Sequence, residues 1–347
     1  MMLFTLGGFF KSVIALFKTR VLSDGGNFEA ETNLENQLNT LGSDLFDSAS
    51  LVITPNGVKT SKLYAIKPTD GSGDLTVTRA TTATRVNSSG LIETVDANVA
   101  RLDYSNGSLP SILVEPQLTN YWTDNNNTNG YTTNTGAIKG NQVINAFGNG
   151  VNGYQYTFDS TGQSFVSNLF SIRVFDTRTY PVNRLCLFIK NPSSDYFSIS
   201  FLNVAQATFR FSNLTSYDSN GSIVKINDNT YALYVHYNTS TTSQYSQVRC
   251  SFVSGFSTNT APINGTAILG LGFWYRATSP TEVPNIYSPI ITTTSAVTRN
   301  ADVISKSELS GITTITETFE NGTTNVINGS PTSYTMSKGR IKKVIGK

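Results

Sequence analysis

The middle of this sequence constrains its fold most strongly. From residue 74 to about residue 305 the chain alternates short runs of β-branched and aromatic residues with turns rich in glycine and asparagine. In "YFSISF" (residues 196–201) apolar and polar residues alternate, and "SIVKINDNTYALYVHYN" is typical of a hairpin that turns at residues 227–230. Many short strands without intervening helices predict a β-sandwich or jelly roll.

The composition agrees with a mainly β chain. The 347 residues include 20 Phe and 16 Tyr, which favour strands, whereas only 14% of residues are charged. A hydrophobic content of 38% is enough for a folded core. The net charge is +2 and no basic stripe runs through the body of the chain, which argues against a nucleic-acid-binding protein.

The residues that commonly bind metals or form disulfides are few and scattered. Cys186 and Cys250 lie in apolar, strand-like runs, so we expect buried free thiols, with a disulfide as the alternative. His236 is the only histidine, and we expect it to be an ordinary strand residue. Because two distant cysteines and one histidine make no zinc spacing, the sequence predicts neither a metal site nor a cofactor.

The N-terminal segment "MMLFTLGGFFKSVIALFKTRVL" is apolar but does not follow the pattern of a secretion signal. Lys11 interrupts the apolar run, and no small-residue cleavage site follows. On a helix the apolar residues would share one face, and leucines recur at helical spacing further on. We predict a helical docking arm that binds a partner protein rather than a membrane, with a helix packed on its own domain as the alternative. The predicted anchoring residues are Leu6, Phe9, Phe10, Val13, Phe17, Leu34 and Leu38.

Four segments are expected along the chain. The docking arm covers residues 1–46, a linker with short strands covers 47–73, and a jelly-roll module covers 74–305. Residues 306–347 would form a hairpin that turns at 320–323, followed by a basic tail. The tail "GRIKKVIGK" is expected either to be solvated or to dock on an acidic partner surface.

A short phrase occurs twice, far apart in the sequence. "VTRATTA" begins at Val77 and "VTRNADV" begins at Val297. Two copies are too few for a solenoid. Since the first and last strands of a sandwich are often neighbours, we expect the two phrases to lie side by side at the limits of one domain.

Both phrases belong to longer segments that resemble a known kind of module. "TRATTATRVNSSGLIETVDANVARLDYSNGSLPSILVEPQLTNYW" (78–122) and "IYSPIITTTSAVTRNADVIS" (286–305) resemble the opening and closing segments of lectin-like, concanavalin-like jelly-roll modules in head and tail fibres of tailed bacteriophages. The Gln-x-Glu-x-Gly phrase usual before the closing segment is absent from "RATSPTEVPN". "VLSDGGNFEAETNLENQL" and "GRIKKVIGK" resemble terminal segments of virion proteins of crAss-like phages that infect Bacteroides.

This resemblance implies a structural virion protein, a head fibre or a tail fibre, anchored by its N-terminus. Its jelly roll would be displayed for adhesion to host or mucus glycans. The implied partners are other capsid or tail proteins, surface glycans and further copies of the chain in a dimer or trimer. The implied location is the virion, assembled in the host cytoplasm. A secreted or surface lectin of a bacterium is the alternative, followed by a polysaccharide depolymerase.

The sequence offers weak candidates for catalysis. Asp103 and Glu115 could form a glycosidase pair, but both lie in phrases shared with non-catalytic binding modules, so we expect structural roles. The loop at residues 123–130 lacks the glycine placement and closing Glu of an EF-hand and is expected to be a solvated turn. Trp122 and Trp274 are expected in the core. We therefore predict no catalytic residues and no enzyme, and the sequence selects no ligand-binding residues.

Overall fold

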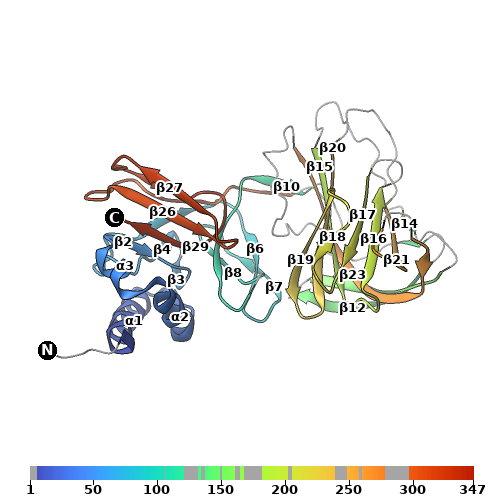
Figure 1. Cartoon of the computed structure of the whole chain (residues 1–347), viewed down its shortest axis with the longest axis horizontal. Coiled ribbons are helices and arrows are strands. Elements are labelled where there is room, and N and C mark those ends of the chain that lie inside the picture. The colour runs from blue at the N-terminus through green and yellow to red at the C-terminus, as the bar shows by residue number, and fades with distance from the viewer. Residues whose placement is uncertain are drawn as a thin grey trace. The chain divides into compact units, whose positions relative to one another are not determined.

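The computed structural model divides the chain into two compact units (Figure 1). The structure describes residues 6–105, 107–120, 132–133, 137–148, 151–160, 165–167, 182–201, 205–238, 248–257, 260–277 and 297–347. Unit 1 comprises residues 1–88, 94–117 and 300–347, and unit 2 comprises residues 89–93 and 118–299.

Unit 1 contains two β-sheets built from both ends of the sequence. In the first sheet the order is β1 (Asn27–Phe28), β3 (Gly57–Lys59), β4 (Lys62–Leu63), β5 (Leu75–Thr78), β25 (Val303–Lys306) and β28 (Tyr334–Thr335). In the second the order is β27 (Thr324–Asn328), β26 (Thr314–Phe319), β29 (Gly339–Gly346), β9 (Ser111–Val114) and β8 (Arg101–Asp103), and β2 (Leu51–Ile53) also pairs with β29. Strand β6 (Ala83–Val86) packs beside β8.

The core of unit 1 brings together apolar residues of both sheets. Leu63, Leu75 and Val77 come from the first sheet, and Leu102 and Ile341 come from the second. All five side chains are almost completely buried. Because these strands are far apart in the sequence, unit 1 gains its core only after its N-terminal and C-terminal segments have met.

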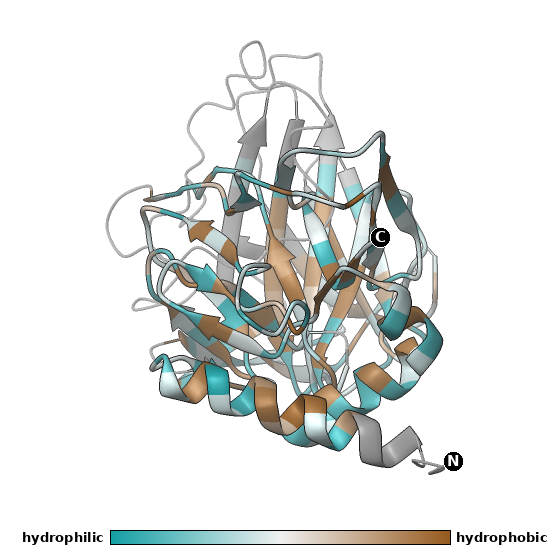
Figure 2. Ribbon diagram, turned by 90° about the vertical axis from the view of Figure 1, so that its left-hand side faces the viewer, coloured by the Kyte–Doolittle hydropathy of each residue, from teal (hydrophilic) through white to brown (hydrophobic). Residues whose placement is uncertain are grey.

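Three helices cover part of unit 1. They are α1 (Leu6–Ser23), α2 (Glu31–Leu41) and α3 (Ser43–Ser48). Hydrophobic and hydrophilic residues alternate along α1, as an amphipathic helix requires (Figure 2). Helix α2 ends at Gly42, whose positive φ of 81° turns the chain while its N–H donates to the Leu38 carbonyl at 3.0 Å.

Unit 2 is a sandwich of two largely antiparallel sheets. The first runs β19 (Gly221–Asn227), β20 (Thr230–Asn238), β15 (Val182–Lys190), β23 (Gly265–Ala277), β13 (Val151–Phe158) and β12 (Ala137–Gly148), where Gly148 meets Ile92 of β7 (Ile92–Val95). The second runs β11 (Thr132–Thr133), β14 (Phe165–Ser167), β21 (Val248–Val253), β16 (Tyr196–Phe201), β17 (Ala205–Arg210) and β18 (Thr215–Ser216), and β22 (Pro262–Ile263) pairs with β21. Strands β10 (Leu118–Asn120) and β24 (Val297–Arg299) form a separate pair.

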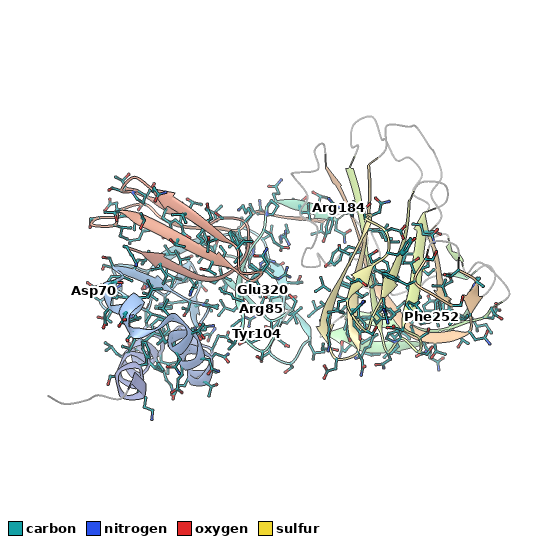
Figure 3. The ribbon with its side chains drawn as sticks, viewed as in Figure 1. Asp70, Arg85, Tyr104, Arg184, Phe252 and Glu320 are labelled. Carbon is teal, nitrogen blue, oxygen red and sulfur yellow. The ribbon has the colours of Figure 1, made fainter. Side chains whose placement is uncertain are left out.

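The core of unit 2 lies between these two sheets. Phe158 of the first sheet packs edge-on against Phe197 and Phe252 of the second, with ring centroids 5.8 and 5.4 Å apart. Phe252 is labelled within the sandwich in Figure 3. The alternating pattern of "YFSISF" thus directs Phe197 and Ile199 inward, and the predicted mainly β, sandwich-type fold is confirmed.

Both predicted hairpins are confirmed, and a close approach of two strands explains one glycine. Strands β19 and β20 form the hairpin predicted to turn at 227–230, and β26 and β27 form the one predicted to turn at 320–323. The register of β15 against β23 shifts beside Gly270. A Cβ added at Gly270 would lie 2.6 Å from the Asn152 carbonyl oxygen, so the close approach of two strands requires glycine there.

The basic segment at the C-terminus is a central strand, and the predicted tail is wrong. Within "GRIKKVIGK", Ile341 and Val344 are completely buried, and β29 pairs with β26, β9 and β2. Lys342 is exposed while these apolar neighbours point inward. The basic residues in this segment led us to predict a tail. Its buried apolar residues are enough to form a strand, because partner strands lie on both sides of it.

The compact units also differ from the predicted segments. Residues 74–88 and 94–117, assigned to a single jelly-roll module, lie in unit 1, as do residues 300–305. The predicted linker at 47–73 supplies core strands β2, β3 and β4. The predicted module is divided between the two units because the chain passes from unit 1 into unit 2 after residue 117 and returns to unit 1 at residue 300.

The two copies of Val-Thr-Arg are not paired with each other. In unit 1, Thr78 of the first phrase pairs with Val303, at the end of the second phrase. In unit 2, residues Val297–Arg299 pair with Leu118–Asn120. The two phrases are therefore neighbours, but the first Val-Thr-Arg lies beside the end of the second phrase and not beside its Val-Thr-Arg. Within the second phrase, the chain passes from unit 2 back to unit 1 at residue 300.

Candidate functional site

An open pocket of about 340 Å³ lies at three turns of the unit 2 sandwich. Its volume is at the lower end of the range of small-ligand sites. Its lining residues come from the turn between β15 and β16, the segment after β17, and the β19–β20 hairpin. They are Pro192, Ser193, Ser194, Asp195, Phe211, Ser212, Asn229 and Tyr231, and we call this site the pocket.

Backbone hydrogen bonds hold these three turns together. The N–H of Asn191 donates to the Asn229 carbonyl at 2.8 Å, which joins the first turn to the hairpin. The N–H of Phe211 donates to the Asp195 carbonyl at 3.0 Å. Ser193 is fixed to β23, because its hydroxyl oxygen accepts from the N–H of Thr266 at 2.7 Å. The turns that line the pocket are therefore held to one another and to β23 by hydrogen bonds.

The Asp195 carboxylate is the charged group of the pocket. It accepts from the N–H and the hydroxyl of Ser212, at 2.7 and 2.9 Å, and from Nε of Arg210 at 3.1 Å. Burial alone would raise the pKa of Asp195, but these donors outweigh it and lower the pKa. The carboxylate is thus ionised at neutral pH, and Nε of Arg210 is its cationic donor.

The pocket also offers a ring surface and exposed polar groups. The rings of Phe211 and Tyr231 lie 4.7 Å apart at an angle of 43°, and Tyr231 is half-buried. Asn229 is exposed, and its side-chain amide bonds to no other residue in the described part of the chain. Aromatic rings beside amide, hydroxyl and carboxylate groups can contact both the apolar faces and the hydroxyl groups of a sugar.

The sequence missed this site because its members are ordinary turn residues. Ser193, Ser194 and Asn229 are typical of loops in any β protein. Only the hydrogen bonds between turns, which are distant in the sequence, bring them together. A run of Ser-Ser-Asp after a predicted strand was the one available signal, and it is weak.

The two acids considered as a glycosidase pair are both buried in unit 1. Glu115 accepts from Nη1 of Arg101 at 2.6 Å, and both side chains are almost fully buried. Asp302 binds Nη1 of Arg79 at 2.8 Å and also Nη2 of Arg101. Burial would lower the pKa of Arg101, but the charges of Glu115 and Asp302 outweigh it and raise the pKa. We call Arg79, Arg101, Glu115 and Asp302 the buried ion network.

Asp103 is held separately from that network. Its carboxylate accepts from the N–H of Val86 at 2.9 Å and from the N–H and hydroxyl of Ser105. Arg340 lies at 3.4 Å. Burial would raise the pKa of Asp103, but the Arg340 charge and these hydrogen bonds lower it. Neither Asp103 nor Glu115 is exposed to a substrate, which supports the structural roles expected for them.

Most of the predicted anchoring residues are already buried within unit 1. Phe10, Phe17, Leu34 and Leu38 are all at most 3% exposed, and they pack on residues of β2 and β29 and on the segment after β4. Val13 packs against the same cluster. Leu6 and Phe9 lie in α1, but their side chains fall outside the described residues. The predicted docking face of the arm is therefore a core face, as in the alternative of a helix packed on its own domain.

Polar contacts fasten the helical segment to unit 1 as well. Arg20 of α1 binds Asp74 at 3.0 Å, and Asp24 accepts from Lys62 and Tyr64 at 2.8 and 2.7 Å. Before α2, Glu29 accepts from the Tyr104 hydroxyl at 2.7 Å and lies 3.7 Å from Arg85. Tyr104 and Arg85 are labelled in Figure 3. The segment predicted as an arm is thus an integral part of unit 1.

The remaining candidates have structural positions or are not described. Cys186 and Cys250 are free and buried, as expected. His236 is a half-buried strand residue paired with Arg184, and burial together with that cation lowers its pKa. Trp122, the side chain of Trp274 and the loop at 123–130 lie outside the described residues.

Neither a metal centre nor a membrane span is evident in the described ranges. Among those residues, no three His, Cys, Asp or Glu side chains gather as metal ligands would. No helix there has the length and apolar character needed to cross a bilayer. Comparison of the sequence with protein-family models and with curated proteins found no match.

Proposed function

We propose that this chain is a structural protein of a tailed-phage virion, a head fibre or a tail fibre, whose unit 2 binds carbohydrate. The observation that carries the glycan-binding part is the pocket, in which the Phe211–Tyr231 ring pair lies beside Asp195, Ser212 and Asn229. Such a site suits adhesion rather than hydrolysis, because its one carboxylate is already held by Arg210 and Ser212.

Attachment to the particle is assigned to unit 1. It contains residues 21–38, which run from the end of α1 into α2, and the strand "GRIKKVIGK", the segments whose sequences resemble terminal parts of crAss-like virion proteins. Since the apolar face of α1 is buried, binding to capsid or tail proteins would use other surfaces of unit 1. We further propose a dimer or trimer, as fibre proteins of this kind commonly form.

Retention on immobilised surface polysaccharide of the bacterial host tests the adhesive role. We expect the full chain to be retained and the variants Asn229→Ala and Tyr231→Ala to lose about tenfold in affinity, the effect of one or two lost contacts. Asn229 is exposed, so its truncation should leave the fold intact. Val326→Ala, at an exposed position of unit 1, is the matched control and should bind as the wild type does. Equal retention of all four proteins would overturn the pocket as the glycan site.

A further inference from the structure

A second group of side chains adjoins the pocket on the outer face of the β16–β17 sheet. Core residues Phe197 and Phe209 point inward from these strands, so Tyr196 and Arg210, one residue along, point outward. We call Tyr196, Arg210, Tyr217 and Phe256 the aromatic patch.

The rings of the patch form a contiguous surface. Phe256 lies 6.3 Å from Tyr196 and 5.5 Å from Tyr217, measured between ring centroids. Tyr217 is 52% exposed, which is unusual for so large an aromatic side chain. Neither tyrosine hydroxyl bonds to another residue in the described part of the chain. This surface can therefore accept the face of a sugar ring.

Arg210 connects the patch to the pocket. Its guanidinium carbon lies 5.7 Å from the centroid of the Tyr196 ring, while its Nε donates to Asp195 at 3.1 Å. The ring and the carboxylate fix the plane of the guanidinium. Among the described residues, Nη1 and Nη2 have no hydrogen-bond acceptor, and the side chain is 39% exposed. The result is a fixed pair of donors at the border between the two sites.

A fixed pair of guanidinium donors fits one chemical group well. A planar carboxylate accepts two parallel N–H bonds from the end of a guanidinium, an arrangement that an uncharged hydroxyl cannot reproduce. Two acidic residues lie near the patch, and neither occupies the end of the guanidinium. Asp195 accepts from Nε of Arg210, and Asp218 accepts from the N–H of Thr208.

We propose that the aromatic patch is a second subsite, which binds the carboxylated residue of an acidic glycan through Arg210 while a neighbouring sugar occupies the pocket. This inference rests on the proposed function and names its ligand class. Tyr196, Tyr217 and Phe256 supply the surface for the sugar ring, and Nη1 and Nη2 of Arg210 bind the carboxylate.

Calorimetric titration of the full chain with matched oligosaccharides tests the inference. The probes are oligomers of galacturonate, glucuronate and mannuronate, each compared with its carboxyl-reduced counterpart, which differs only in lacking the acid. We expect at least one acidic oligomer to bind about tenfold more tightly than its reduced form, in line with one charge-assisted pair. Arg210→Gln should abolish that difference, and added salt should weaken the acidic member of the pair more than the neutral one.

The matched control is Lys225→Gln, which removes another surface cation of unit 2. Among the described residues Lys225 forms its ion pair with Asp228, which is itself exposed, so this variant should keep the preference for the acidic form. Equal binding of acidic and reduced oligomers would overturn the second subsite but leave the proposed function standing. A preference that survives in Arg210→Gln would also overturn it. Absence of binding to any of the oligomers would contradict the inference, and absence of retention on host polysaccharide as well would contradict the proposed function.

Discussion

Asp302 illustrates how one side chain joins distant parts of unit 1. Its carboxylate binds Arg79 and Arg101 and also accepts from the N–H of Glu115 at 2.8 Å. Its backbone carbonyl accepts from Lys338 at 2.5 Å. Arg79, Arg101 and Glu115 come from residues 78–122 and Asp302 comes from residues 286–305, so these contacts join two distant segments within unit 1.

Removing the Asp302 charge should strongly destabilise unit 1. Asp302→Asn leaves Arg79 and Arg101 buried with one acid between them, and breaking a buried ion pair in this way typically costs about 3–5 kcal/mol. Asp228→Asn is the control, since Asp228 is 98% exposed and its pairing with Lys225 should contribute well under about 1 kcal/mol. Urea unfolding of both variants measures the difference, and similar midpoints would contradict the role of the network.

Asp103 should make unit 1 sensitive to acid. Its pKa is lower in the folded state than the ordinary value of about 3.9 in an unfolded chain, so its stabilising effect is present above pH 4. That effect is lost as the pH falls below 4 toward the lowered folded-state pKa. Asp103→Asn should therefore be less stable than the wild type at pH 7 and lose less stability between pH 5 and pH 3. Unfolding free energies measured across this range would contradict the assignment if the two proteins fell in parallel.

In helix α1, the burial of the apolar side chains shows that the helix packs on its own unit and does not present this face to a partner protein. Phe17 and Leu16 are neighbours in the sequence, yet Phe17 is 3% exposed and Leu16 is 52% exposed. Phe17 lies over β3, where a Cβ added at Gly57 would be 2.9 Å from its ring. The helix thus fits onto a strand that has no side chain at the point of closest approach.

A pair of truncations on α1 tests this packing. Phe17→Ala removes a buried ring and should cost about 3–5 kcal/mol, whereas Leu16→Ala should cost about 0.5 kcal/mol or less. Hydrogen exchange of the amides in residues 6–23 reports on the helix directly. We expect faster exchange in Phe17→Ala and unchanged exchange in Leu16→Ala. Equal exchange in the two variants would mean that α1 is not held by its apolar face.

Elements of this fold were predictable where the pattern is local. The hairpins at 227–230 and 320–323 follow from turn residues between alternating strands, and the amphipathic pattern predicts α1. The partner of each apolar face was not predictable, because the periodicity of α1 is the same for a core helix and for a docking helix. The strand role of "GRIKKVIGK" and the composition of the pocket depend likewise on contacts between distant segments.

Unit 2 consists of two insertions within unit 1, a short one of residues 89–93 and a long one of residues 118–299. The ends of the long insertion are paired with each other, since Leu118 lies opposite Arg299. On the unit 1 side, the N–H of Asp302 donates to the Glu115 carbonyl at 2.9 Å. Adjacent chain ends are typical of a domain inserted into another, and no composition shift in the sequence marks them.

Unit 1 should therefore fold without unit 2. We expect a chain in which a short Gly-Ser turn replaces residues 118–299 to unfold cooperatively and to keep its α1 amides protected from hydrogen exchange. The buried ion network remains complete in that chain, because Arg79, Arg101, Glu115 and Asp302 all lie in unit 1. Circular dichroism without a cooperative thermal transition would contradict the independence of unit 1.

We propose that this chain belongs to a phage particle and displays unit 2 on the outside of that particle. Gold-labelled antibody against unit 2, imaged by electron microscopy on purified intact particles, tests it most directly. We expect label on the particle surface, over the capsid for a head fibre or at the tail for a tail fibre. Absence of label from every intact particle, with the same antibody binding the purified chain, would contradict it.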